Sequence, residues 1–362
     1  MDLSEPSSSM EDQMGNEEST SSQEWSVLFD AAIAFKGLKC WEWMYDSDVF
    51  GVQNPETGEI GYCCVMGRLG EVLALNVYPG PKGLASYRHL HELARRGAPE
   101  DALGSHALLN TQRCVMVSYE DRSDLQAEDL DLIRSLGLKF RGKKAWPMFR
   151  SYRPGYLPWF LSSSEARLLL VALQQAVKVA EQIRVDPLVL GTQKDAHKKI
   201  LVRKFEKGMW KDAWEHPPED ESLPIVPIIN DLRLAQLKQA NFPRKGTWAT
   251  DCIFLPMPIQ DGTRPYFPYA FPVLSREGMI MGMELLNPGE IESTVPQTFM
   301  DLLEKAQSLP QSLQVGSEQI FVLLEPIARK LKFPIQRVEP LPALEAFLQS
   351  MEGFLGGAGT MR

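Results

Sequence analysis

The chain has 362 residues, of which 44% are hydrophobic and 23% charged, and its formal net charge is -9. These proportions indicate a soluble globular protein long enough for two domains, and no apolar run reaches the roughly 18 residues that favour a membrane span. Five cysteines, an odd number, argue against a disulfide framework and favour a reducing compartment. With an acidic, polar N-terminus that lacks the apolar core of a secretory signal, the sequence predicts a cytoplasmic protein with no membrane partner.

Acidic residues are concentrated at the start of the chain. Residues 1–24 hold seven acids and no base, so the remainder is close to neutral. Residues 1–23 also lack large apolar side chains, and we predict that they form a disordered acidic tail. The near-neutral remainder neither requires nor excludes a nucleic-acid partner.

Residues 24–186 are predicted to form an α+β domain. Ser21-x-x-Glu24 and Ser162-x-x-Glu165 have the pattern of capping boxes, and each precedes an apolar stripe at helical spacing. Turn residues at Asn54–Gly58 separate two runs with strand character. The expected strands cover 49–53, 60–65, 71–78 and 112–119, and the expected helices cover 25–36, 83–95, 128–136 and 162–186.

Residues 187–222 are predicted to hold a hairpin, with strands over 200–205 and 209–214, and then a polar, Pro-rich linker. Residues 223–355 are predicted to form the second domain, a mixed sheet with helices in the order βββαβαβα. Residues 356–362 are expected to be a flexible tail. The expected strands of the second domain cover 248–255, 266–274, 279–286, 312–315 and 335–338, and the expected helices cover 298–308, 317–330 and about 344–351.

The segment from Lys139 to Phe160, called here the aromatic–basic segment, has seven aromatic and six basic residues and no acid. Aromatic faces combined with Arg and Lys are suited to stacking bases or docking anions. This interpretation predicts a ligand-binding surface for nucleic acid or another polyanion. Its candidate residues are Lys143, Lys144, Trp146, Arg150, Tyr152, Arg153, Tyr156 and Trp159.

A structural hub is the alternative interpretation of the same segment. Its aromatics would fill the seam between a sheet and the following helix, and its prolines predict an extended or turning path. The two interpretations differ in what they predict for Arg150 and Arg153. Docking requires both guanidinium groups in solvent, whereas a hub buries them against carboxylates.

The sequence contains no motif of a known catalytic or cofactor site, and we predict no cofactor. The βββαβαβα order is that of a ribonuclease H-like fold, which is an analogy of fold alone. Nucleases of that fold hold two metal ions with acids on the first strand, the first helix and the end of the fourth strand. Asp251 and Glu304 occupy the first two places, but Val315-Gly316-Ser317 supplies no third carboxylate. A degenerate metal-dependent hydrolase or nuclease is therefore the alternative function.

Two blocks, residues 41–62 and 145–160, resemble an uncharacterised bacterial two-domain family described only by domains of unknown function. The last third, with Leu341-Pro-Ala-Leu344 before its final helix, resembles the second domain of that family. The resemblance implies a two-domain division and a bacterial cytoplasmic setting, and it implies no activity. We expect a non-enzymatic binding protein whose ligand-facing surface is the aromatic–basic segment.

Overall fold

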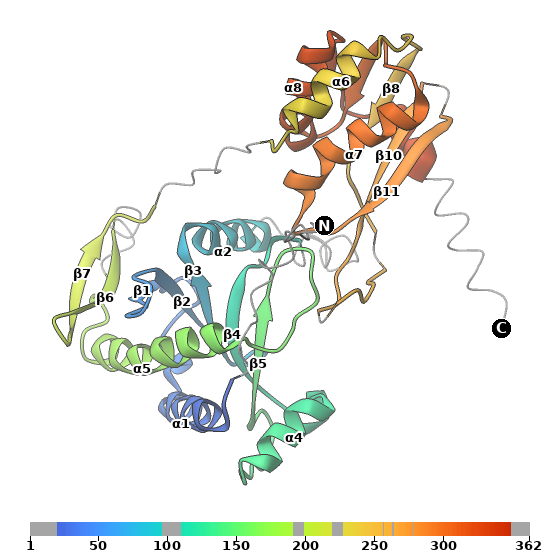
Figure 1. Cartoon of the computed structure of the whole chain (residues 1–362). Coiled ribbons are helices and arrows are strands. Elements are labelled where there is room, and N and C mark those ends of the chain that lie inside the picture. Colours follow the sequence, from blue (N-terminus) through green and yellow to red (C-terminus); the bar gives the residue numbers. More distant parts are fainter. Residues whose placement is uncertain are drawn as a thin grey trace, which may run out of the picture. The chain divides into compact units, whose positions relative to one another are not determined.

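The computed structural model describes residues 20–95, 110–190, 199–218, 227–255, 257–262, 264–276 and 278–348. Most of the predicted N-terminal tail and all of the predicted C-terminal tail lie outside these ranges. The protein is α+β and consists of two compact units (Figure 1). Residues 154–157 belong to the second unit, although the chain before and after them belongs to the first.

A seven-stranded sheet forms the centre of the first unit, in the order β5-β4-β3-β2-β1-β6-β7. Neighbouring strands are antiparallel except β1 and β6, which are parallel. The hairpin predicted at residues 200–214 therefore provides the last two strands of this sheet and is not part of a linker between domains. The strands are β1 (Phe50–Gln53), β2 (Ile60–Met66), β3 (Ala74–Pro79), β4 (Cys114–Glu120), β5 (Trp146–Tyr152), β6 (Ile200–Glu206) and β7 (Met209–Glu215).

Helices cover both faces of the first sheet. Both predicted capping boxes are present, at Ser21 and Ser162, and the helices that follow them pack on the same face as Val77 and Val115. Side chains alternate along a strand, so their neighbours Tyr78 and Cys114 point to the opposite face, under α2. The helical elements are α1 (Ser22–Leu38), η1 (Cys40–Glu42), α2 (Gly80–Arg95), η2 (Arg122–Asp124), α4 (Ala127–Ser135) and α5 (Ser163–Val185).

The second unit has a mixed sheet whose main path is β11-β10-β8-β12-β13, with the short β9 paired to β10. β10 is antiparallel to its neighbours, whereas β8, β12 and β13 run parallel to one another. The carboxyl ends of three strands therefore meet at one edge. The strands are β8 (Thr247–Thr250), β9 (Ile253–Phe254), β10 (Tyr269–Ser275), β11 (Ile280–Leu286), β12 (Ser312–Val315) and β13 (Ile335–Arg337).

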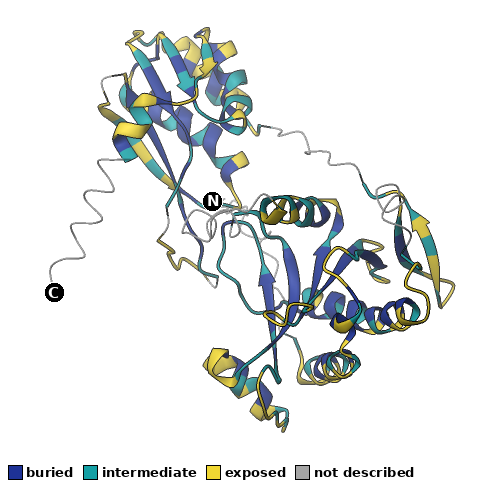
Figure 2. Cartoon of the chain, turned by 180° about the vertical axis from the view of Figure 1, so that it is seen from behind, coloured by how far each residue is buried: buried dark blue, intermediate teal, exposed yellow. Residues whose placement is uncertain are grey.

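Helices α6 (Asp231–Gln239), α7 (Ile291–Ala306) and α8 (Glu318–Leu331) cover one face of the second sheet, and a helix over 342–348 packs on the other. The prediction that residues 312–338 form two strands joined by a helix is confirmed. The ribonuclease H-like assignment stays an analogy. Buried residues concentrate in the central strands of each sheet, whereas exposed residues lie on outer helix faces, on turns and on the edge strands β7 and β11 (Figure 2). In the described part of the chain, no helix has both the length and the apolar character that crossing a membrane requires.

Candidate functional site

Strand β5 holds the middle of the aromatic–basic segment at one edge of the first sheet. Its backbone amides alternate in direction, and that of Ser151 points away from β4 toward Trp159. Position 147 has the same direction, so Pro147 removes no hydrogen bond of the ladder with β4. Successive residues of β5 face opposite sides of the sheet, which separates Arg150 from Ser151. The strand therefore divides the side chains of the segment between two environments.

Arg150 is buried, with 4% of its surface exposed. Its guanidinium group donates to both carboxylate oxygens of Asp129 on α4, at 2.8 and 2.5 Å, and to the Phe149 carbonyl at 2.8 Å. The group also lies over the Phe160 ring, 4.8 Å from its centre. A neighbouring helix already supplies a carboxylate partner to Arg150, as the hub interpretation predicts.

Arg153 is more exposed, but it also has an internal carboxylate partner. Glu165, in the first turn of α5, accepts from Arg153 at 3.2 Å and from the Ser151 hydroxyl at 2.7 Å. The same carboxylate closes the capping box by accepting from the Ser162 amide at 3.0 Å. Arg153 thus helps to hold β5 to the start of α5.

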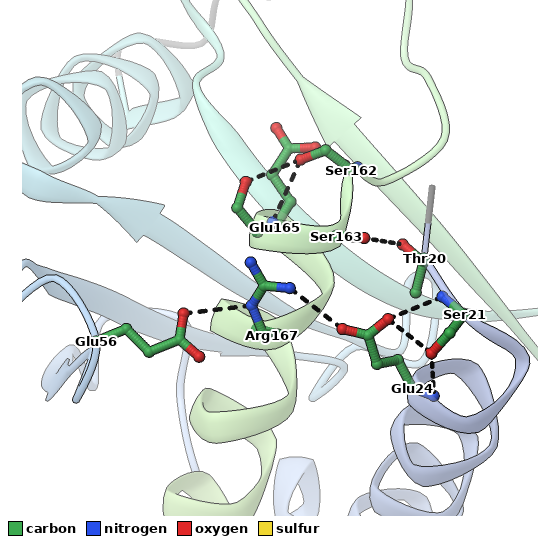
Figure 3. A network of polar contacts seen from close by, with 9 residues as sticks. Thr20, Ser21, Glu24, Glu56, Ser162, Ser163, Glu165 and Arg167 are labelled. Atoms are coloured by element: carbon green, nitrogen blue, oxygen red, sulfur yellow. Dashed lines mark hydrogen bonds and ion pairs between the residues drawn. The ribbon is translucent and has the colours of Figure 1, made fainter. Parts of the chain in front are cut away.

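Arg167, one turn further along α5, connects that helix to two other elements of the first unit (Figure 3). Its guanidinium group lies 3.2 Å from Glu24 on α1 and 3.2 Å from Glu56 in the turn after β1. Glu24 is itself the capping-box carboxylate of α1, and its pKa is lowered mainly by the hydrogen bonds from Ser21. The network pairs this cation with internal acids and is structural.

Aromatic residues of the segment also have internal packing partners. Trp146 meets Phe140 edge to face, with 5.7 Å between ring centres, and Trp159 meets Phe160 in the same way at 5.4 Å. Tyr152 lies with the cluster under α2, where burial raises the pKa of its hydroxyl. These contacts agree with the hub interpretation.

Tyr156 belongs to the second unit. Its hydroxyl donates to the Asn287 side chain, and its ring centre lies 5.8 Å from that of Tyr266. Backbone bonds on either side, from the Phe267 amide to the Gly155 carbonyl and from the Leu157 amide to the Pro265 carbonyl, attach the segment there. The eight candidate residues are therefore divided between the two units.

Basic residues at the start of the segment differ from those in β5. Lys144 is engaged, since its amide donates to Asp121 at 2.6 Å and its ammonium to the Gly70 carbonyl at 2.8 Å. Lys139, Arg141 and Lys143 are exposed and have no ion-pair partner within the described part of the chain. Of these three cations, Lys143 is one of the predicted docking residues, and Lys139 and Arg141 lie near it in the same segment.

A pocket of about 390 Å³ lies in the second unit, where the parallel strands β8, β12 and β13 end. Its floor is formed by the first residues beyond these strands, Asp251, Gly316, Ser317 and Val338. Ligands of open α/β sheets bind at the carboxyl ends of parallel strands, so this edge is the expected place for a site. Such pockets commonly measure about 300–1,000 Å³.

Asp251 is the buried charge of this pocket, with 8% of its surface exposed. Its Oδ1 atom accepts from the Cys252 amide at 2.7 Å and from the Ser317 hydroxyl at 2.8 Å. Its Oδ2 atom lies over Gly316, where a Cβ atom would be 2.4 Å away. Among the described residues, Oδ2 has no hydrogen-bond partner, so one carboxylate oxygen is left for a ligand.

The rim of the pocket is charged and one wall is apolar. Glu318 and Arg337 pair across the opening at 2.6 Å, and Glu339 and Glu345 are also on the rim. The wall opposite Asp251 is formed by leucines that precede or belong to the final helix, namely Leu341, Leu344 and Leu348.

Glu304 does not join Asp251 in a metal site. It accepts from Arg233 on α6 at 2.9 and 2.6 Å, and hydrogen bonds from this guanidinium group lower the pKa of Glu304. Glu304 is not among the residues that line the pocket. In the described ranges no three acidic, histidine or cysteine side chains group as metal ligands, so the acids do not fit the predicted two-metal centre.

Sequence reasoning identified Asp251 but not its surroundings. The sequence places Gly316 and Ser317 where a third acid would be needed, and it predicts that a helix begins at residue 317. The available signal was the strand–helix–strand order of 312–338, which predicts that strand ends converge. The leucine wall could not be read from the sequence, because it depends on where the last helix packs.

Fold and pocket together define a two-domain α+β protein with a pocket at a sheet edge, in which one carboxylate, that of Asp251, is buried. Residues 25–203 match a domain of unknown function, DUF7309, and residues 233–352 match a second, DUF6930. The two matches together cover most of the chain, which agrees with the resemblance found in its sequence. A comparison with curated proteins gives no match.

Proposed function

We propose that the protein is a binding protein whose ligand occupies the pocket at the ends of β8, β12 and β13. The observation that carries the proposal is Asp251, a buried carboxylate with one oxygen lacking an internal partner among the described residues. A charge held in a pocket without a full set of partners costs free energy, which a complementary ligand can offset. The apolar wall beside it supplies the second element of a small-molecule site.

A pocket-filling substitution tests this proposal. A library of small charged and neutral compounds is screened by thermal shift against the full chain, because a ligand of the folded state raises its melting temperature. Leu344→Trp fills the pocket, whereas Leu285→Trp makes the same change at an exposed position of β11. We expect the hits to be lost with Leu344→Trp and kept with Leu285→Trp. Hits that survive Leu344→Trp unchanged would refute the proposed site.

Polyanion docking is a second candidate function, in which Lys139, Arg141 and Lys143 would contact the polyanion. It is supported by the exposure of these three cations and by the absence of ion-pair partners for them among the described residues. Replacing all three with Gln should weaken oligonucleotide binding and reduce its salt slope by about one unit for each phosphate that is no longer neutralised. Arg153→Gln is the control, since Arg153 is paired with Glu165. Equal binding by the triple variant and the wild-type chain would exclude this function.

We propose that the protein is located in the bacterial cytoplasm. It is supported by the five cysteines, all of which are free thiols, as a reducing compartment requires. A thiol titration of protein unfolded without reductant, taken from the native host, tests it. The expected result is five reactive thiols per chain, and a smaller number would contradict the assignment.

A further inference from the structure

We propose that the ligand of this pocket is a small aliphatic amine, bound through its ammonium group to the Oδ2 atom of Asp251. This inference rests on the binding function proposed above and adds the chemical class of the ligand. Asp251 is 8% exposed, lines the pocket, and offers Oδ2 without a hydrogen-bond partner among the described residues. A cationic donor placed there gains a charge-assisted hydrogen bond to a largely buried carboxylate.

The net charge of the pocket favours a cationic ligand over an anionic one. Asp251, Glu318, Glu339 and Glu345 bring four carboxylates, against the single guanidinium group of Arg337. The amino ends of α8 and of the final helix each add about half a positive charge, which does not cancel the acids. A carboxylate or phosphate ligand would therefore meet a negative pocket, whereas an ammonium group would be attracted to it.

The geometry of Asp251 selects an ammonium group over a guanidinium group or a metal ion. Oδ1 already accepts from the Cys252 amide and the Ser317 hydroxyl, so Oδ2 alone is available. A guanidinium fork binds best to two carboxylate oxygens, whereas an ammonium group is a compact charge that can donate to one. Divalent cations take several oxygen ligands, and no group of three suitable side chains exists in the described part of the chain.

The apolar wall favours an aliphatic group as the remainder of the ligand. Leu341 is buried, and Leu344 and Leu348 are half-buried, so together they present aliphatic surface beside the charged floor. An alkyl chain attached to the ammonium group would cover this surface, and each buried CH₂ contributes about 0.8 kcal/mol in general. A pocket of about 390 Å³ is at the small end of ligand sites, which favours a short chain.

A matched probe series tests the proposal on the full chain. Pentylamine, pentanol and pentanoate share an alkyl chain and differ in charge, and calorimetry gives the affinity of each. We expect pentylamine to bind at least about tenfold more tightly than either analogue, as a hydrogen bond to a charged group allows. Equal or tighter binding of pentanol or pentanoate would overturn the amine assignment while leaving the proposed binding pocket in place.

Substitutions then assign the preference to Asp251. Asp251→Asn keeps the shape and removes the charge, and should abolish the preference for the amine. Glu304→Gln removes an acid outside the pocket and should leave it unchanged. Glu339→Gln with Glu345→Gln alters only exposed rim acids and should weaken amine binding even if Asp251→Asn does not fold. An amine preference that persists in the rim variant and in Asp251→Asn would refute the proposal.

Two further binding experiments identify the kind of molecule that carries the ammonium group and test whether the pocket binds a metal ion instead. N-acetyl-lysinamide carries the same group on a peptide-like molecule. If it binds as tightly as pentylamine, the proposal holds for a lysine side chain, and if only pentylamine binds, it holds for a free amine. Magnesium ion alone is the competing probe, and displacement of pentylamine by magnesium at comparable affinity would overturn the proposal. If no probe of any charge binds, the proposed binding function fails with it.

Discussion

Arg150→Gln is expected to destabilise the first domain strongly without removing a binding function. Arg150 is 4% exposed and Asp129 is 8% exposed, and the two are joined by paired hydrogen bonds of 2.8 and 2.5 Å. Glutamine is shorter and neutral, so it cannot satisfy both oxygens of Asp129. The substitution therefore leaves a buried carboxylate without its counter-charge.

The size of the effect follows from the burial of both partners. Removing one member of a buried ion pair costs about 3–5 kcal/mol, because the remaining charge is uncompensated. A whole domain is stable by about 5–15 kcal/mol, so this single change removes a large share of the total. Arg153→Gln is the matched control, since the Arg153 side chain is 42% exposed. Partly exposed pairs contribute about 0–1 kcal/mol.

Denaturant unfolding followed by tryptophan fluorescence measures both variants. All tryptophans except Trp248 lie in the first unit, so the signal reports mainly on that unit. A third variant combining Arg150→Met with Asp129→Leu removes both charges, and we expect it to be more stable than Arg150→Gln. If Arg150→Gln and Arg153→Gln lose the same small amount of free energy, the hub interpretation of this pair is refuted.

Gly316→Ala should weaken pentylamine binding and lower stability by about 1–3 kcal/mol, because its Cβ atom would meet the Asp251 Oδ2 atom at 2.4 Å. Calorimetry and melting measure this against Gly37→Ala, an open helical position where alanine should stabilise by up to about 1 kcal/mol. Tyr156→Ala should lower the stability of the second unit by about 1–3 kcal/mol, which faster amide exchange at residues 264–267 would show. Unchanged exchange at these residues would contradict the packing of Tyr156 in the second unit. Burial raises the pKa of Cys114 from 9.0 to about 12, so the unfolded chain releases this proton first. The contribution of Cys114 to the free energy of unfolding is present below pH 9.0 and is lost as pH rises toward 12. Denaturant unfolding of Cys114→Ala should therefore show a smaller loss of stability over that window than the wild-type chain. An identical loss in both would refute the assignment.

Local signals predicted much of the fold. Ser21 and Ser162 begin α1 and α5 as expected, because a capping box satisfies its hydrogen bonds within four residues. Ser317 begins α8 as a simple N-cap, because its hydroxyl accepts from the Ile320 amide. Helix α6 was missed, because its polar sequence buries only Leu234 and Leu237 and carries a weak apolar stripe.

Long-range pairing explains what the sequence did not reveal. The parallel pairing of β1 with β6 joins residues near 51 and 202, and no local pattern specifies that distance. The exposure of Arg150 depends on Asp129, which belongs to a separate helix. A basic residue between aromatics has the same local sequence whether its partner is an internal carboxylate or an external phosphate.

The pocket was predictable only in part. Asp251 was predicted within an expected strand over 248–255, whereas the structure ends β8 at Thr250 and places Asp251 just beyond it. Its burial, its free oxygen and the leucine wall come from three strand ends and the final helix, which are far apart in the sequence. The same long-range packing places Glu304 beside Arg233, outside the pocket.

Leucine-methyl NMR of the full chain titrated with pentylamine tests most directly whether the protein binds an amine in the Asp251 pocket. The account predicts that the methyl signals of Leu344 and Leu348 shift with a saturating dose dependence. Those of Leu169 and Leu173, buried in the first unit, should stay in place. Shifts confined to leucines outside the pocket, or saturation unaffected by Asp251→Asn, would contradict it.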